Sequence, residues 1–355
     1  MNLILIKPDE RSTNASGDGA IIIDLSPNDE RTQHLLNHLN KKNGDSVSIG
    51  FIDSYGGWKC KAIIQYCPNN TDNKNKNGIG VRLLPTSNEP SPSLKQSFSA
   101  SLPQITLLLA LPFPARLKYL WPVMASFTSV TRIIIVKSTL SNPEFLHSKA
   151  LHPSTYDPLI VKGMSQGGRT RPISVDICVN EEEDETISRS LLVRLGLVAT
   201  NDGTSTNTTA RIFFDCGADE NDDTTPPLPP PARDLVLAEC CCERRTMSDT
   251  DDDANSTTTT AAAAAAPSAI LAIGPERGWT DNESNLFVND CGFKSATLGS
   301  SILRVDTAVV SALSVVSAAL EECQRMSNNN VAGEVDDRMK RKRSDSMERQ
   351  RKELT

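Results

Sequence analysis

The segment 273-IGPERGWTDNESN-285 follows an apolar run and places glycine, proline, a carboxylate and arginine where a strand should end and a helix should begin. Gly274 and Gly278 remove side chains at a sharp turn, and Pro275 fixes the backbone between them. A second segment, 298-LGSSILRVDTA-308, repeats the arrangement with a glycine turn, an arginine and a polar helix start. Two such turns close together predict one ligand site, although either alone would also suit an ordinary strand-to-helix connection.

The two segments lack the groups that hold phosphates. They contain no phosphate-loop lysine followed by Ser or Thr and no Gly-x-Gly-x-x-Gly pattern, so a nucleoside triphosphate or NAD site is poorly supported. Backbone amides and carbonyls beside Leu298, Ile302 and Leu303 would instead suit a flat heteroaromatic ring such as adenine.

The C-terminal half has the pattern of an α/β domain. The runs 105-ITLLLAL-111 and 132-RIIIVK-137 are continuously apolar, and a segment of helical length follows each. Short runs of this kind are typical of a parallel sheet covered on both faces. Further strands are predicted at 172–179, 211–214, 269–273 and 296–298, and a final helix from 306 to about 322.

Residues 1–88 are predicted to form a small β-barrel. In 58-WKCKAII-64, apolar and polar residues alternate as they do in a half-buried strand. We therefore expect a barrel at 1–88, a linker at 89–103, an α/β domain at 104–325 and a charged disordered tail at 326–355. The expected barrel strands are 3–6, 21–25, 46–52, 58–64 and 79–84, with one helix near 29–39.

Two low-complexity segments, at about 217–232 and 246–267, read as disordered insertions. They hold eight of the acidic residues, so the net charge of −7 becomes about +1 without them. The folded part is then roughly neutral, and binding to RNA phosphates stays possible.

Metal and membrane sites are not expected. The nine cysteines have no paired spacing, and His34 and His38 lie four residues apart without an evident third ligand. No apolar run is long enough to cross a bilayer, and Met1 leads almost directly into a strand-like run. A soluble cytoplasmic protein is expected, with a plastid or mitochondrion as the alternative location.

Taken together, the two quoted segments closely resemble the paired C-terminal motifs of the RsmE-type methyltransferases. These enzymes modify N3 of a uridine in small-subunit (16S-type) ribosomal RNA and belong to the SPOUT class. In addition, 162-KGMSQGGRTRPISV-175 resembles the family's glutamine-glycine-arginine-proline stretch, and 33-QHLLNHLNKKNGDSV-47 resembles part of its PUA-like barrel. The resemblance implies a trefoil-knotted parallel sheet, S-adenosylmethionine as cofactor and a homodimer.

The resemblance also implies roles for individual residues. Arg304 is expected to stabilise negative charge on the uracil ring, with a solvated or structurally paired arginine as the alternative. Glu276 is the second candidate for a catalytic role. The expected cofactor contacts are Ile273, Gly274, Pro275, Gly278, Leu298, Gly299, Ile302 and Leu303; the expected RNA contacts are Arg169, Arg171 and Arg277.

The chain departs from the family pattern at several positions. Arg277 replaces a glycine, Asp306 replaces a glutamate, and Ser300 and Ser301 replace a proline and a basic residue. The helix at 121-WPVMASFTSV-130 also lacks the family's lysine and glutamate-leucine-glycine-valine element. These departures keep an alternative open, namely a non-catalytic RNA-binding or ribosome-assembly factor that retains the scaffold.

Overall fold

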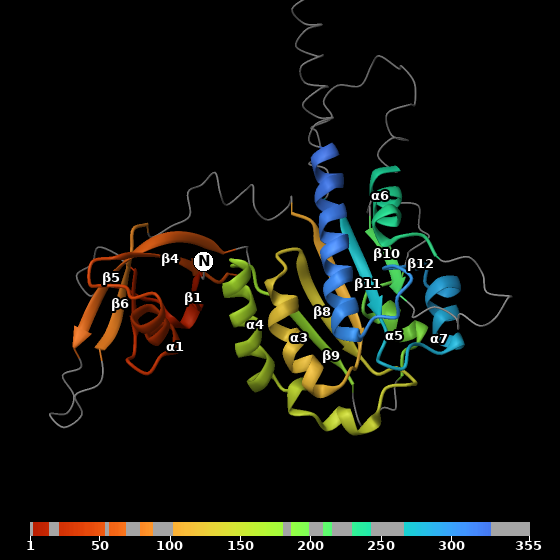
Figure 1. Cartoon of the computed structure of the whole chain (residues 1–355), viewed down its shortest axis with the longest axis horizontal. Helices are drawn as coiled ribbons and strands as arrows, with labels where there is room; N and C mark the ends of the chain where they lie inside the picture. Colours follow the sequence, from red (N-terminus) through yellow and green to blue (C-terminus); the bar gives the residue numbers. More distant parts are fainter. Residues whose placement is uncertain are drawn as a thin grey trace, which may run out of the picture.

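The structure is a computed structural model of the chain with two six-stranded sheets, one in each half (Figure 1). It describes residues 3–13, 21–53, 57–68, 79–87, 102–179, 186–198, 209–214, 229–242 and 266–327. Most of the two predicted insertions and the charged tail lie outside these residues.

The N-terminal sheet is a mixed half-barrel with strand order β1-β4-β5-β6-β3-β2, in which β1 pairs parallel to β4 and the other pairs are antiparallel. Its core includes Ile6, Ile49 and Phe51, and Leu35 of the small helix packs into it. All five expected strands are present, and the structure adds the short β2 and η1, which the sequence did not predict. The elements are β1 (Ile4–Ile6), η1 (Pro8–Glu10), β2 (Ser12–Thr13), β3 (Ile21–Leu25), α1 (Glu30–Gln33), η2 (His34–His38), β4 (Ser46–Phe51), β5 (Trp58–Pro68) and β6 (Ile79–Pro85).

The C-terminal sheet is entirely parallel, with strand order β12-β10-β11-β7-β8-β9. Its strands are β7 (Gln104–Ala110), β8 (Val130–Val136), β9 (Ser174–Cys178), β10 (Thr209–Phe214), β11 (Ser268–Ile273) and β12 (Lys294–Ala296). Its helices are α3 (Pro114–Ser126), η3 (Pro143–His147), η4 (Lys149–Leu151), α4 (Pro153–Gly167), α5 (Arg189–Arg194), α6 (Ala232–Cys242), α7 (Asp281–Asn285), η5 (Leu286–Asp290) and a long helix at 305–327.

Both faces of this sheet are buried, which explains its continuous apolar strands. Leu107 and Leu109 of β7 face the core formed with α3, α4, α6 and the helix at 305–327. Leu108 and Ala110 face the opposite core, formed with α5, Trp279 and η5. The predicted α/β architecture is therefore confirmed.

Helices α3 and α4 touch through their backbones. A side chain at Gly163 would collide with the carbonyl of Pro122, and one at Gly167 would collide with the carbonyl of Ser126. Two glycines one turn apart thus let the helices approach more closely than any other residue would allow.

The end of α4 also joins the two halves of the chain. Leu3 N–H donates to the carbonyl of Ser165 at 3.2 Å, and Ser165 Oγ donates to the carbonyl of Leu3 at 2.5 Å. Thr170 lies so close to Gly50 and Gly57 that a side chain at either glycine would strike it. The half-barrel is therefore fixed to the α/β domain at this point.

Two local features differ from the sequence-based expectation. Strand β12 ends at Ala296, because Thr297 leaves the sheet and exchanges backbone hydrogen bonds with Pro230 and Ala232. Residues 229–232, which were expected to be the disordered end of an insertion, are instead held by these bonds and lead into α6.

Candidate functional site

Both quoted segments lie at the carboxyl edge of the parallel sheet. The first follows β11 and the second follows β12, and the loops after β7 and β8 reach the same edge. Ligand sites of open α/β sheets form at this edge, in the crevice outside the strand ends. The structure therefore brings the two segments to one side of the domain.

The loop after β11 is a tight turn. Gly278 N–H donates to the carbonyl of Pro275 at 3.0 Å, and Gly278 has φ of 73°, in the region that favours glycine. Trp279 packs against Gly274, where a side chain would meet the indole, and its Nε1–H donates to the carbonyl of Phe214 at 3.1 Å. The turn is thus anchored to the end of β10, with Ile273, Gly274 and Pro275 buried.

Glu276 connects this loop to the neighbouring one. Its Oε1 accepts hydrogen bonds from Phe113 N–H and from Arg116 Nη1, each at 3.0 Å. Phe113 is the residue before the first turn of α3, where backbone N–H groups lack helical partners and favour a carboxylate. Glu276 therefore fixes the loop after β11 to the start of α3, and the adjacent Arg277 is exposed.

A second carboxylate, Glu283, makes a similar connection on the other side of the loop. It is buried and accepts hydrogen bonds from the backbone and hydroxyl groups of Thr139 and Thr280. The sequence reading did not assign it a role, although the Thr-x-x-Glu spacing from Thr280 is the signature of a helix capping box.

The loop after β12 presents its backbone and an apolar side chain to the surface. Gly299 has φ of 129°, and nothing lies within 4 Å of the position where its side chain would begin. Thr297 Oγ1 holds the loop by accepting from Gly299 N–H at 3.0 Å and donating to the Gly299 carbonyl at 2.7 Å. Ile302 is 80% exposed, while Leu298 and Leu303 are half-buried. An uncovered isoleucine beside an open backbone is a surface suited to a flat apolar ligand.

Arg304 stands at the start of the helix at 305–327. Its carbonyl accepts the first helical hydrogen bond, from Ala308 N–H at 2.8 Å. Its guanidinium is 67% exposed and lies 3.4 Å from Asp306 Oδ1, measured from Nε. The positive end of the helix dipole and the guanidinium thus lie together at the carboxyl edge, where they favour negative charge.

The structure places Arg169 differently from the RNA contact that the sequence suggested. The side chain is 4% exposed, and its guanidinium donates to the carbonyls of Phe127, Thr128, Val130, Arg171 and Pro172. Burial lowers its pKa to about 10, assisted by the charge of Arg171, so the group still carries its proton at neutral pH. Arg169 has no exposed face for RNA and instead holds the loop before β8; Arg171 remains half-exposed.

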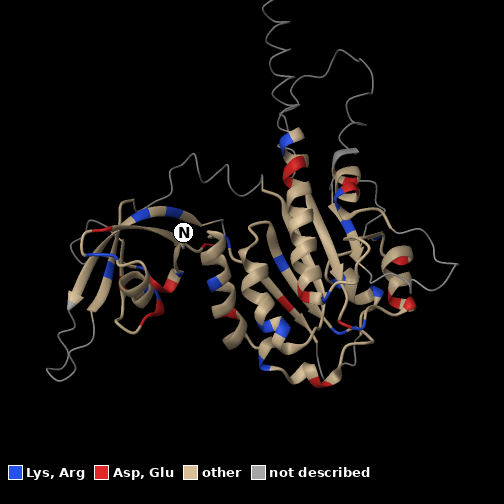
Figure 2. Cartoon of the chain, in the orientation of Figure 1, with Lys and Arg blue, Asp and Glu red and all other residues tan. Residues whose placement is uncertain are grey.

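The candidate site residues thus fall into two groups. The loops after β11 and β12 lie at the same edge of the sheet, whereas Arg169 is buried within the α/β domain, beside Thr170 of the junction with the half-barrel. Basic side chains occur on the half-barrel strands and near the lower ends of α3 and the helix at 305–327 (Figure 2). In the described part of the chain, no group of three or more His, Cys, Asp or Glu side chains is placed to hold a metal ion, and no helix is long and apolar enough to cross a membrane.

Comparisons with known proteins agree with this location. Residues 229–317, which include both loops, match the family model of an RNA methyltransferase domain. Ribosomal RNA small subunit methyltransferase E from a Synechocystis species is 50% identical over 52 residues, which are 15% of this chain and 17% of that protein. The match thus spans less than a fifth of the relative's length.

Solved structures extend the likeness to the fold. A probable rRNA-methyltransferase from Porphyromonas gingivalis has a TM-score of 0.50 at 14% identity, covering 90% of this chain and 99% of its own. A ribosomal RNA small subunit methyltransferase E from Neisseria gonorrhoeae bound to S-adenosyl methionine has a TM-score of 0.48 at 15% identity, covering 90% and 97%. The Porphyromonas structure shows that a half-barrel followed by a parallel-sheet domain is a fold that this chain shares.

Proposed function

We propose that this chain, which carries an RNA methyltransferase domain of the RsmE type, methylates N3 of a uridine in small-subunit ribosomal RNA with S-adenosylmethionine as the methyl donor. The observation that carries the proposal is the pairing of an exposed Arg304 with an uncovered Ile302 at the carboxyl edge. The Arg304 guanidinium suits negative charge that develops during the reaction, and the Ile302 side chain suits a flat ligand.

The residues of the two loops fit the proposed cofactor. Ile302, Leu298 and Leu303 offer an apolar surface for a purine ring, and the open backbone at Gly299 lets a ligand approach closely. Ile273, Gly274, Pro275 and Gly278 form the other turn at the same edge of the sheet, which Trp279 and Glu276 hold in place. When bound, S-adenosylmethionine supplies a methyl group activated by a positively charged sulfur.

Methylation at N3 requires a protein group that stabilises negative charge on the uracil ring. Uracil N3 carries a weakly acidic proton, and its loss spreads charge onto O2 and O4. The N3 proton passes to solvent as the methyl group leaves the sulfur and bonds to N3, and a guanidinium can donate a charge-assisted hydrogen bond to O2 or to O4; Arg304 is exposed and close to a helix N-terminus. We assign Arg304 this role, and Glu276 the role of positioning the loop after β11, since both hydrogen bonds to its Oε1 come from protein groups.

RNA binding and assembly complete the proposal. Arg171 and the exposed Arg277 are the arginines proposed to contact RNA. The chain is proposed to work as a homodimer with a knotted sheet, as the resemblance implies, and in the cytoplasm. Light scattering that finds a monomer at concentrations where methylation is fully active would reject the dimer.

The first test is binding and transfer. Calorimetry of the purified protein with S-adenosylmethionine should detect binding, and small-subunit RNA should receive a labelled methyl group. A well-folded protein that binds RNA but not S-adenosylmethionine would instead support the assembly-factor alternative.

The second test locates the methyl group. Mass spectrometry of ribosomal RNA from each compartment of cells that lack the protein should show the loss of one 3-methyluridine. Loss of a different modified nucleotide would reject the N3 assignment and keep the methyltransferase activity, and the compartment affected would test the cytoplasmic location.

A further inference from the structure

An exposed aromatic pair lies at the carboxyl edge beside the proposed site. The rings of Phe113 and Phe145 are 4.8 Å apart between centroids, tilted by 48°. Phe145 is half-buried and packs on the core, whereas Phe113 is 47% exposed. A phenylalanine with so much exposed surface at a loop that precedes a helix contributes little to the core, and it leaves one ring accessible to a ligand.

This pair is held rigidly. Arg116 lies over the Phe113 ring, with its guanidinium carbon 5.5 Å from the centroid, and Arg116 is fixed in turn by Glu276 of the proposed cofactor loop. The segment that carries Phe145 is fixed as well, because buried Trp121 donates from Nε1 to the carbonyl of Ala150 at 2.9 Å. Phe113 is therefore positioned by the same contacts that position the loop after β11.

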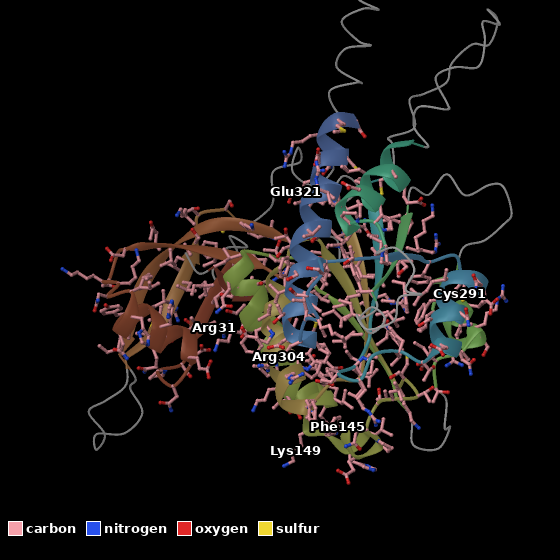
Figure 3. All side chains as sticks on the ribbon, turned by 45° about the vertical axis from the view of Figure 1, so that its right-hand side comes forward. Arg31, Phe145, Lys149, Cys291, Arg304 and Glu321 are labelled. Atoms are coloured by element: carbon pink, nitrogen blue, oxygen red, sulfur yellow. The ribbon has the colours of Figure 1, made fainter. Side chains whose placement is uncertain are left out.

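Cationic side chains lie near the pair. Arg116 is mostly buried and ion-paired with Glu276, while Lys149 of η4 is exposed and Arg304 stands at the same end of the domain, as Figure 3 shows for Phe145, Lys149 and Arg304. Aromatic rings flanked by cations are the groups that bind single-stranded nucleic acid, in which bases stack on the rings and phosphates contact the cations.

We infer that the Phe113–Phe145 pair is a stacking platform for an unpaired base of the RNA substrate, adjacent to the uridine that is methylated. This inference rests on the proposed function for the identity of the reaction. It assigns substrate recognition to residues outside both cofactor loops. Because a stacked base would be held beside the loop that Glu276 positions, the platform would place the neighbouring uridine at that loop.

The test compares variants of Phe113 in the full-length protein, with a short oligouridylate as the probe. Phe113→Ala and Phe113→Leu should each weaken oligouridylate binding by about five- to a hundredfold, the scale of losing one stacked base. Phe113→Trp should restore binding to near the wild-type value. Phe113→Leu keeps the backbone N–H bond to Glu276 and an apolar contact with Phe145, so it separates the loss of stacking from the loss of folding.

Tyr119→Ala is the matched control. Tyr119 is 61% exposed on the same helix, and among the described residues its ring contacts no other aromatic ring. Its removal should leave oligouridylate affinity unchanged at the same salt concentration. S-adenosylmethionine affinity, measured by calorimetry, should be unchanged in all four variants.

The outcomes distinguish this platform from the proposed function. Unchanged oligouridylate affinity in Phe113→Ala and Phe113→Leu, or wild-type protein that binds S-adenosylmethionine but no oligouridylate, would overturn the platform alone. Weakened RNA binding in a protein that never binds S-adenosylmethionine would leave the platform and remove the methyltransferase. If Phe113→Ala separates a dimer in light scattering, the ring belongs to a subunit interface and the platform is rejected.

Discussion

Glu276 and Arg116, distant in the sequence, form an ion pair of 3.0 Å that joins the loop after β11 to the first turn of α3. Both side chains are mostly buried, with 17% and 26% of their surface exposed. The pair therefore links the proposed cofactor loop to the helix that carries the aromatic platform.

If Glu276 is a positioning residue, Glu276→Ala and Arg116→Ala should behave alike. Each should lower the free energy of unfolding by about 1–3 kcal/mol, because each leaves partly buried polar groups without partners. The double variant should cost little more than the larger single change, which denaturant titration can measure. Abolished turnover in Glu276→Ala with near-normal turnover in Arg116→Ala would place Glu276 in the chemistry.

Arg304→Ala should separate catalysis from binding. We expect turnover to fall roughly a hundredfold while S-adenosylmethionine affinity stays within a few fold, the scale of losing one charge-stabilising donor. Arg304→Lys should recover only part of the rate, since an ammonium lacks the planar pair of donors. Arg325→Ala, at the other end of the same helix and 72% exposed, is the control. Wild-type turnover in Arg304→Ala would make Arg304 structural.

Gly299→Ala should affect cofactor binding through backbone strain. A side chain there meets open space, but φ of 129° is unfavourable for alanine, and the strain should cost about 1–3 kcal/mol or move the loop. Gly44→Ala is matched, because Gly44 also has positive φ, at 89°, and open space, but lies in the half-barrel. Calorimetry should show weakened S-adenosylmethionine binding in Gly299→Ala only. Equal binding in both variants would remove Gly299 from the site.

Substitution of Arg169 should affect the stability of the fold, whereas substitution of Arg171 should affect RNA binding. Arg169→Ala leaves buried carbonyls without a donor and should lower the free energy of unfolding by about 3 kcal/mol or more. Arg171→Ala should leave the thermal midpoint nearly unchanged and weaken RNA binding at low salt. If Arg169→Ala unfolds at the wild-type temperature, the hydrogen bonds from Arg169 to these carbonyls do not stabilise the fold.

The fold was largely predictable because its signals are local. The continuous apolar runs of β7 and β8 are buried on both faces, and the alternating residues of β5 give one buried face. The hydrophobic pattern of each strand therefore shows how many of its faces are buried. The failure at β12 has a physical reason. Thr297 and Leu298 are residue types common in strands, but the Thr297 backbone hydrogen-bonds to Pro230 of a distant segment. No local sequence pattern predicts that contact.

The candidate site was predictable in part. Glycine and proline identify the two turns, because each of these residue types has backbone preferences that are typical of turns. The partners of charged groups cannot be read in this way, since Arg169 looks in sequence like an exposed arginine on a glycine-flanked loop. Two of its five carbonyl acceptors, Arg171 and Pro172, are local, but the other three lie at 127–130, which is 39 to 42 residues away in the sequence. Glu276 likewise takes its partners from α3, which only the strand order of the sheet brings near.

The glycine contact between α3 and α4 bears on how a substrate is accommodated. A hinge between the half-barrel and the parallel-sheet domain would require α4 to swing with Leu3 and Thr170 while α3 stayed in place, yet Gly163 and Gly167 lie against the α3 backbone. These contacts oppose movement along this axis, so if the chain binds RNA as proposed, the RNA would have to adapt its shape to the protein. Selectivity would then reflect which RNA segments unfold readily enough to reach a rigid receptor.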